Sequence, residues 1–344
     1  MPFWINLAVS VFAFAVAAVS GIVLVPFLHR LKFGQPIKTE EGPQWHEKKQ
    51  GTPTMGGFMF IIASVLAAFV GYCLYRWRCG VDMTDSANHD SLFLFLSCII
   101  FSLLFGLIGF IDDFLKVARK HNDGLSAIQK MAMQFVFAGA FLFAMYMFGD
   151  TSTVIDLGFF SFDAGIFYYV IMLVLIIYLT NAVNLTDGVD GLCGSVTFVA
   201  MLVFTVAASI LDFKEISIFT MALAGGCLGF LLWNLNPAKC FMGDTGSMFL
   251  GAAVTGVGLI LHKHLLLVLA ALVYILEALS VVIQVLYFKY TKRKSPTHEG
   301  KRLFKMTPIH HHFEMSNFSE YKIVITFSLT GAVCGVLGIL TLFL

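Results

Sequence analysis

Two adjacent carboxylates end one of the apolar segments of the chain. Asp112 and Asp113 lie in the sequence GLIGFIDDFLK, directly after a run of uncharged residues. Neighbouring carboxylates repel each other, so such a pair suits either a proton acceptor or the binding of a divalent cation such as Mg²⁺. The alternative is a solvated helix end with two ordinary carboxylates. The pair alone does not decide between these interpretations.

A second polar cluster lies in residues 181–192, with the sequence NAVNLTDGVDGL. It contains Asn184, Asp187 and Asp190, whose amide and carboxylate oxygens suit a hydrated Mg²⁺ or the polar groups of a sugar or nucleotide. Two glycines in the segment let backbone N–H groups approach a ligand closely. Because the segment has no Lys or Arg, its carboxylates lack a local partner. This pattern favours a binding function over a plain turn.

A third cluster is NLNPAKCFMGDTGS, residues 234–247. Asp244 lies between two glycines just before an apolar run, where it suits either a metal ligand or a helix cap. Thr245 and Ser247 are possible helix caps as well. Phe241 lies in the same polar loop, where an exposed ring can stack on a nucleotide base. A ring that dips into the membrane interface is the alternative for Phe241.

A fourth cluster, KMTPIHHHFE, contains three consecutive histidines, His310, His311 and His312. Consecutive side chains cannot all point one way, so a zinc site built from this run alone is geometrically poor. Basic residues lie close by in the sequence (Lys301, Arg302 and Lys305), and together with the histidines they suit a polyanion such as a pyrophosphate. The alternative is a solvated surface run.

Four further positions complete the set of polar candidates. Lys49 and Thr54 lie in EKKQGTPTMGG, residues 47–57, whose basic, hydroxyl and glycine residues suit phosphate or nucleotide contacts. Lys130 begins another apolar run and would lie near the Asp pair if the two neighbouring helices pack together. Glu277 stands apart within an apolar segment, with Ser280 and Gln284 on the same helical face, and this spacing favours a polar contact between helices.

These residues must be positioned by membrane-spanning helices. The chain is 58% hydrophobic and 12% charged, whereas a soluble domain carries about 25% charged residues, so the composition argues against the alternative of a soluble protein with buried helices. Apolar runs of about 20 residues, enough to cross about 30 Å of hydrocarbon, predict an all-α polytopic membrane protein. The ten predicted spans are 4–28, 54–75, 92–111, 129–148, 166–181, 192–211, 216–234, 246–261, 265–288 and 322–343.

The charges predict how the spans are oriented. Loops 29–53, 112–128, 182–191, 235–245 and 289–321 hold most of the 22 Lys and Arg residues, whereas the opposite loops hold only Arg76, Arg78, Lys214 and Lys263. By the positive-inside rule the first set is cytoplasmic, which places both termini outside and the polar clusters at the cytoplasmic face. The first span lacks a basic segment before it and reads as an uncleaved anchor.

The rest of the sequence predicts one small structural element and no second domain. The outer loop 149–165 alternates polar and apolar residues around Gly158, which predicts a short β-hairpin. The seven cysteines form no CxxC pair, so neither a zinc site nor a disulfide framework is indicated. No internal repeat or linker is visible, so residues 1–344 are interpreted as one integral membrane domain.

Five motifs together resemble one protein family: GTPTMGG, GFIDDFLK, NAVNLTDGVDGL, FMGDTGS and PIHHHFE. Their order and the span pattern are similar to those of the phospho-N-acetylmuramoyl-pentapeptide transferases. These form a branch of the polyprenyl-phosphate N-acetylhexosamine-1-phosphate transferase superfamily, found in the bacterial plasma membrane. The Asp pair and NLTDG are shared across the superfamily, whereas PIHHHFE is typical of the muramoyl branch.

The resemblance implies a reaction and its requirements. UDP-MurNAc-pentapeptide and undecaprenyl phosphate would give UMP and lipid I, the first membrane step of peptidoglycan synthesis, with Mg²⁺ as cofactor. A homodimer is a further expectation from the family, and no nucleic-acid partner is expected. A lipid phosphate is largely ionised near neutral pH, since the second pKa of a phosphomonoester is about 6. This favours direct attack over a covalent phospho-aspartate, although the sequence leaves both mechanisms open.

The resemblance also implies roles for the candidate residues. Mg²⁺ is assigned to Asp244 with help from Asn184, and the lipid phosphate to Asp112 with support from Asp113. The remaining roles concern the donor. Phe241 would stack on the uracil, and Asp190 and Lys49 would contact its edge. The ribose would contact Thr54, Asn184 and Asp187, and the pyrophosphate and MurNAc would contact Lys130, His310, His311 and His312.

Three other functions compete with this interpretation. A transferase of GlcNAc-1-phosphate would share most motifs, but PIHHHFE argues against it. A proton-coupled transporter would need charged residues in the middle of several spans, and the sequence offers chiefly Glu277. A structural scaffold would not need so many polar motifs on one face of the membrane.

Overall fold

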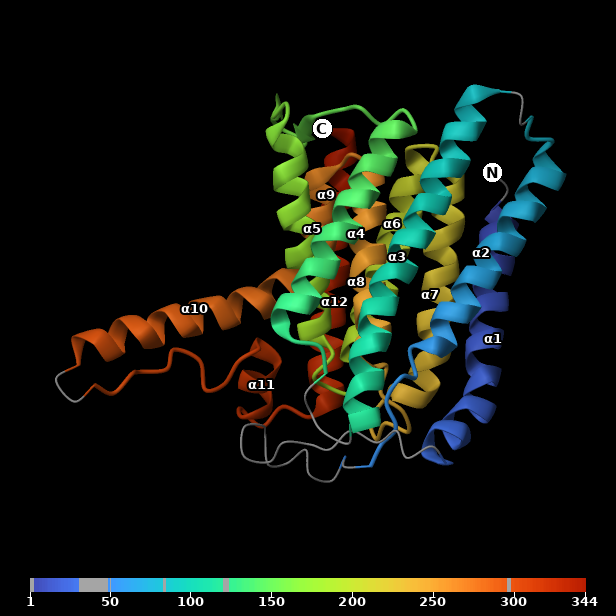
Figure 1. Cartoon of the computed structure of the whole chain (residues 1–344). Helices are drawn as coiled ribbons and strands as arrows, with labels where there is room; N and C mark the ends of the chain where they lie inside the picture. The colour runs from blue at the N-terminus through green and yellow to red at the C-terminus, as the bar shows by residue number, and fades with distance from the viewer. Residues whose placement is uncertain (1–2, 31–48, 50, 83–84, 120–123, 296–297) are drawn as a thin grey trace.

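The computed structural model describes residues 3–30, 49, 51–82, 85–119, 124–295 and 298–344. Most of the long helices run side by side in a bundle, whereas α10 leaves it obliquely (Figure 1). The elements in chain order are α1 (Phe3–Arg30), α2 (Phe58–Cys79), α3 (Ser86–Arg119), α4 (Ala127–Met147), β1 (Val154–Asp156), β2 (Ser161–Asp163), α5 (Phe167–Thr186), α6 (Leu192–Ile210), α7 (Lys214–Asn234), α8 (Gly243–Ile260), α9 (His264–Ala270), α10 (Leu272–Lys294), α11 (Ile309–Glu314) and α12 (Glu320–Leu340), followed by a short 3₁₀ helix, Thr341–Phe343.

The predicted all-α polytopic class is confirmed. Within the part of the chain that the structure describes, nine helices are long and apolar enough to cross a membrane, namely α1 to α7, α10 and α12. The predicted span 246–261 corresponds to α8, which is not among the nine. Its first turn, GDTGS, is polar and lowers its mean hydropathy. The total of ten crossings therefore stays a prediction.

The predicted span 265–288 is two helices rather than one. The chain breaks at Ala271 between α9 and α10, and α10 then points away from the bundle (Figure 1). Neither glycine nor proline marks this break in the sequence, so the apolar run gave no local signal for it.

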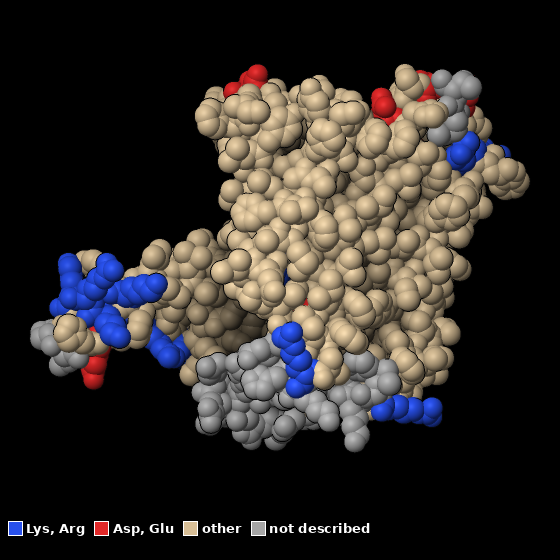
Figure 2. Space-filling model, viewed as in Figure 1, with Lys and Arg blue, Asp and Glu red and all other residues tan. Residues whose placement is uncertain are grey.

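The two ends of the chain lie on the same side of the bundle. Helix α1 begins and α12 ends opposite α11 (Figure 1), as the predicted placement of both termini outside requires. The flank seen in Figure 2 shows few charged residues. Lys and Arg gather at the tip of α10, and scattered basic side chains are visible at both ends of the bundle. Lys32, Lys38, Lys48 and Lys120 of the charge pattern lie outside the described residues, and the cytoplasmic orientation stays a prediction.

The β-hairpin predicted in the loop 149–165 is confirmed. Strands β1 and β2 pair antiparallel, with Ile155 opposite Phe162, and Gly158 in the turn has a φ of 80°. The hairpin is tied to the start of α9, because Lys263 contacts Asp156 at 2.6 Å. It lies at the end of the bundle opposite α11 (Figure 1).

Helix α8 occupies the centre of the bundle and is almost entirely buried. Small residues allow its neighbours to approach closely. A Cβ on Gly109 of α3 would lie 2.0 Å from the Asp244 carbonyl oxygen, and a Cβ on Gly57 would lie 2.5 Å from Gly246 Cα. The first turn of α8 therefore packs tightly between the end of α3 and the start of α2, and this packing brings Asp244 close to Asp112 and Asp113.

Candidate active site

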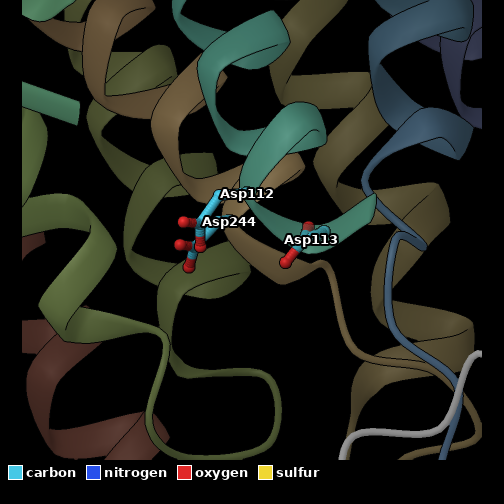
Figure 3. Close-up of side chains that lie close together, drawn as sticks. All are labelled: Asp112, Asp113 and Asp244. Carbon is cyan, nitrogen blue, oxygen red and sulfur yellow. The ribbon is translucent and has the colours of Figure 1, made fainter. Parts of the chain in front are cut away.

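Three carboxylates from two distant motifs meet where α3 approaches α8. One oxygen each of Asp112, Asp113 and Asp244 lies within 4.8 Å of the others. Asp112 and Asp244 lie side by side, with Asp113 set apart from them across the end of α3 (Figure 3). The side chains of Asp112 and Asp113 are buried. So many carboxylates in a desolvated position need cations to offset their charge.

Two lysines supply part of that compensation. Lys116 lies 2.6 Å from Asp112 and 3.3 Å from Asp244, and Lys130 lies 2.7 Å from Asp244. The predicted position of Lys130 near the Asp pair is confirmed, since α4 packs beside α3.

Hydrogen bonds to backbone and hydroxyl groups fix the Asp pair. Asp112 accepts a hydrogen bond from the Leu125 N–H (2.8 Å). Asp113 accepts two from Thr245, from its N–H (2.9 Å) and its hydroxyl (2.7 Å). The other Asp113 oxygen, Oδ1, is buried and has no hydrogen-bond partner among the described residues. The Asp113 carboxylate is therefore held rigidly with one oxygen still available.

The expectation that Thr245 and Ser247 are helix caps is wrong. Helix α8 already begins at Gly243 and has no side-chain cap, so both residues lie inside the helix. The Thr245 hydroxyl bonds Asp113 instead, and the Ser247 hydroxyl donates to the Gly243 carbonyl.

The end of α5 contributes amide and carboxylate groups to the same cluster. Asn184 donates through Nδ2 to Asp244 (2.9 Å) and to Ser247 (2.8 Å). The pKa of the Asp187 carboxyl is raised well above its ordinary range by burial and then by the nearby carboxylates of Asp244 and Asp113. Asn181 faces α4, where it exchanges hydrogen bonds with Gln134. Within residues 181–192, Asn184 and Asp187 therefore lie near the aspartate cluster, whereas Asn181 joins α5 to α4.

The aspartate group fits a divalent cation. Carboxylate oxygens are the ligands that Mg²⁺ prefers, and Asp113 Oδ1, which has no hydrogen-bond partner among the described residues, could serve as one of them. The structure places Asp112 and Asp113 beside the predicted ligand Asp244, in a group of carboxylates that could hold a metal ion. Asn184 presents its N–H side to Asp244, so its predicted role as a metal ligand stays a prediction.

A cavity of about 680 Å³ opens beside the aspartates, between the ends of α3 and α4. Asp112 and Asp244 line it, whereas Asp113 does not. Three cations also border it, namely Lys116, Arg119 and Lys130. Such a lining can hold a phosphate group next to Asp112.

Lys49 and Asp190 meet in an ion-pair network. The Lys49 ammonium lies 2.7 Å from Asp190 and 2.8 Å from Glu320 at the start of α12. Burial lowers the pKa of Lys49, but the hydrogen bonds to these carboxylates outweigh burial and leave its pKa raised. Asp190 also accepts hydrogen bonds from Asn236 Nδ2 and the Ala238 N–H. The network joins four segments that are far apart in the sequence, those of Lys49, Asp190, Asn236 and Glu320.

The segments of Thr54 and Phe241 run alongside each other. The Phe241 N–H donates to the Pro53 carbonyl, and the Gly56 N–H donates to the Phe241 carbonyl, both at 2.8 Å. The Phe241 ring is half-buried, and stacking on a base stays a prediction. The buried Thr54 hydroxyl lacks a hydrogen-bond partner among the residues described. Glu47, Lys48 and Gln50 of this motif lie outside the described residues.

The three histidines point to three different partners, as their consecutive positions predict. His310 is buried, and its Nδ1 lies 3.1 Å from Glu277. His311 Nδ1 lies 2.6 Å from Glu314, and His312 Nδ1 accepts a hydrogen bond from the Lys305 N–H. The predicted contact between helices for Glu277 is confirmed, since it joins α10 to α11.

Comparisons with known proteins agree with these motifs. A family model described as glycosyl transferase family 4 matches residues 95–262. The phospho-N-acetylmuramoyl-pentapeptide-transferase of Shouchella clausii is 39% identical over 340 residues, which cover 98% of each chain. That of Listeria monocytogenes is 42% identical over 95% of this chain and 97% of its own. The chain belongs to the phospho-N-acetylmuramoyl-pentapeptide-transferase family.

Membership of this transferase family fits the fold. The nine apolar helices of the described residues and the bacterial relatives together make the chain a multi-pass protein of a bacterial membrane. The glycosyl transferase match contains the aspartate motifs and the segment 181–192, whereas the triple histidine lies beyond it. The transferase relatives, in contrast, match nearly the whole chain.

Three charged residues at the site of this family member were not identified from the sequence, namely Lys116, Arg119 and Glu320. Lys116 follows Asp112 by one helical turn, and this i,i+4 spacing is the signal that could have identified it. Glu320 gave no such signal, because it follows Lys49 by 271 positions.

Proposed function

We propose that this chain transfers phospho-MurNAc-pentapeptide from UDP-MurNAc-pentapeptide to undecaprenyl phosphate, giving lipid I and UMP. The observation that carries the proposal is the meeting of Asp112, Asp113 and Asp244 beside a cavity bordered by cations. The full-length relatives are named for transfer of this phospho-sugar. A lipid acceptor fits a site at the end of a membrane helix bundle.

The reaction is a single displacement at phosphorus. An oxygen of the lipid phosphate forms a bond to the sugar-linked phosphorus of the donor. The bond between that phosphorus and the bridging oxygen breaks, and the bridging oxygen leaves with UMP. Phosphoryl transfer of this kind needs little covalent help from the protein, so positioning and charge compensation supply most of the rate.

The cavity next to Asp112 is the proposed place of the acceptor phosphate. Lys116 and Arg119 line it and would attract a phosphate, while Asp112 orients its attacking oxygen. Asp113 is fully buried behind Thr245 and would support Asp112 rather than touch the acceptor. Lys130, which pairs with Asp244, would face the donor pyrophosphate.

We assign Mg²⁺ to Asp244, Asp112 and Asp113, with Asn184 beside them. When bound, it would neutralise charge on the donor pyrophosphate and on the departing UMP. The three carboxylates would hold the ion in one position, because α3 and α8 are in tight contact through Gly109. Asp113 keeps an oxygen without a partner among the described residues for this purpose.

The donor would lie on the other side of Asp244. Phe241 would stack on the uracil, with Lys49 and Asp190 at its edge and the other polar groups of this region, Thr54, Asn184 and Asp187, toward the ribose. The segment of His310, His311 and His312 would lie at the pyrophosphate and MurNAc, with His310 in contact with the donor and His312 directed toward the Lys305 backbone instead. Ten crossings with outside termini would place this site at the cytoplasmic face, where the soluble donor is made, and the family further suggests a homodimer.

The proposal is tested by UMP release from the purified protein in detergent or nanodiscs. Release is expected only when the donor, undecaprenyl phosphate and Mg²⁺ are all present, and excess EDTA is expected to abolish it reversibly. Omission of the lipid is the matched control, because simple hydrolysis of the donor would continue without it. Restoration of turnover by Zn²⁺ alone, with no response to Mg²⁺, would instead indicate a histidine metal site.

A further inference from the structure

A buried carboxylate on α10 holds the first residue of the triple histidine. Glu277 and His310 are 0% and 1% exposed. Glu277 Oε2 lies 3.1 Å from His310 Nδ1 and 3.4 Å from the His310 backbone nitrogen. One carboxylate oxygen therefore contacts both the ring and the backbone of the same residue, which fixes the position and the rotation of the imidazole.

The opposite ring nitrogen faces the donor side of the site. His310 Nε2 is buried and has no hydrogen-bond partner among the described residues. It lies against Gly188, where an added Cβ would come within 2.3 Å of it. Gly188 directly follows Asp187, which the proposed function places at the donor. A buried ring nitrogen without a hydrogen bond costs free energy unless a group of a bound ligand forms one with it.

We propose that Glu277 is a positioning residue for the transfer reaction and acts through His310; this inference rests on the proposed function. A carboxylate is purely an acceptor, so the proton of a neutral imidazole bound to it lies on Nδ1. Nε2 is then presented to the donor with its lone pair in a fixed direction, where it can accept a hydrogen bond from a hydroxyl or N–H group of the MurNAc-pentapeptide part rather than from the pyrophosphate. In metal sites, loss of a carboxylate that orients a ligating histidine costs about tenfold to hundredfold in affinity or activity, and an effect of similar size is expected here.

Anchoring of the loop alone does not explain the buried carboxylate. Gln284, two turns further along α10, already ties the loop to this helix. It accepts hydrogen bonds from the N–H groups of Leu303 and Phe304 and donates one to the Phe304 carbonyl. A second anchor could be made without placing an ionisable group inside a membrane helix, where it is costly and therefore indicates function.

The test is a double-mutant cycle that combines Glu277→Gln with His310→Ala. Glutamine retains an oxygen that can accept the same hydrogen bonds, but its amide group can also donate to Nδ1 and so permits the other tautomer. Glu277→Gln is expected to lower kcat for UMP release by about tenfold to hundredfold, with a much smaller change in KM and an unchanged melting temperature. In the His310→Ala background the same substitution is expected to have no further effect.

Ser280→Ala is the matched control, because among the described residues the Ser280 hydroxyl donates its one hydrogen bond to the Glu277 backbone carbonyl within the same helix; its turnover is expected to equal that of the wild type. Equal fold losses from Glu277→Gln in both backgrounds would overturn the inference, since Glu277 would then act independently of His310. Wild-type turnover of Glu277→Gln would overturn it too. Absence of UMP release from the wild type would instead contradict the proposed function itself.

Discussion

Replacement of Asp244 by asparagine is expected to lower the rate of UMP release by on the order of 10²–10³-fold, the loss typical when one group that compensates reacting charge is removed. Asparagine keeps the size of the side chain but removes the charge that pairs with Lys130 and Lys116. Asp112→Asn and Asp113→Asn are expected to have comparable effects, because all three carboxylates belong to one cluster.

Each variant is measured for turnover, for yield after purification and for melting temperature. Asp212→Asn is the control, because Asp212 is largely exposed and pairs with Lys214 away from the cluster. Its turnover is expected to match the wild type. A variant of Asp112, Asp113 or Asp244 that folds normally and retains near wild-type turnover would exclude that residue from the chemistry.

Replacement of the three histidines one at a time is expected to give unequal losses. His310→Ala removes the buried ring that faces Gly188, and a loss of about a hundredfold in turnover is expected. His312→Ala is expected to have little effect, because His312 contacts the Lys305 backbone and the Phe304 ring. His311, paired with Glu314, is expected to give an intermediate loss.

The comparison needs saturating donor and acceptor, so that weaker binding is separated from slower transfer, together with elemental analysis for zinc. Three small and similar losses would indicate a solvated run and remove the histidines from the site. Three complete losses with stoichiometric zinc would indicate a metal site instead. Either result would contradict the proposed contact of the histidines with the donor, and no residues would then account for selection of the muramoyl donor.

The sequence identifies the candidate groups of the site better than it predicts their contacts. Asp112, Asp113 and Asp244 stand out because charge at the end of an apolar helix is costly and therefore informative. Their convergence depends on the close approach of α3 and α8 at Gly109, which one sequence does not reveal. A glycine within an apolar run looks the same whether or not another helix packs on it.

Contacts across long sequence separations were the part that could not be predicted. Glu277 was expected to contact another helix, but its pairing with His310 requires α10 to leave the bundle and the chain to return beneath it. The break that redirects α10 lies at Ala271, within a continuous apolar run. Tertiary packing, rather than a local helix-breaking residue, places it there.

The choice of donor tests the central claim most directly. UMP release is measured with undecaprenyl phosphate and Mg²⁺, with UDP-MurNAc-pentapeptide in one series and UDP-GlcNAc in the other, at matched concentrations. Rapid release with the muramoyl donor, and release near background with UDP-GlcNAc, is the expected result. Equal or faster release with UDP-GlcNAc would contradict the claim and indicate a GlcNAc-1-phosphate transferase.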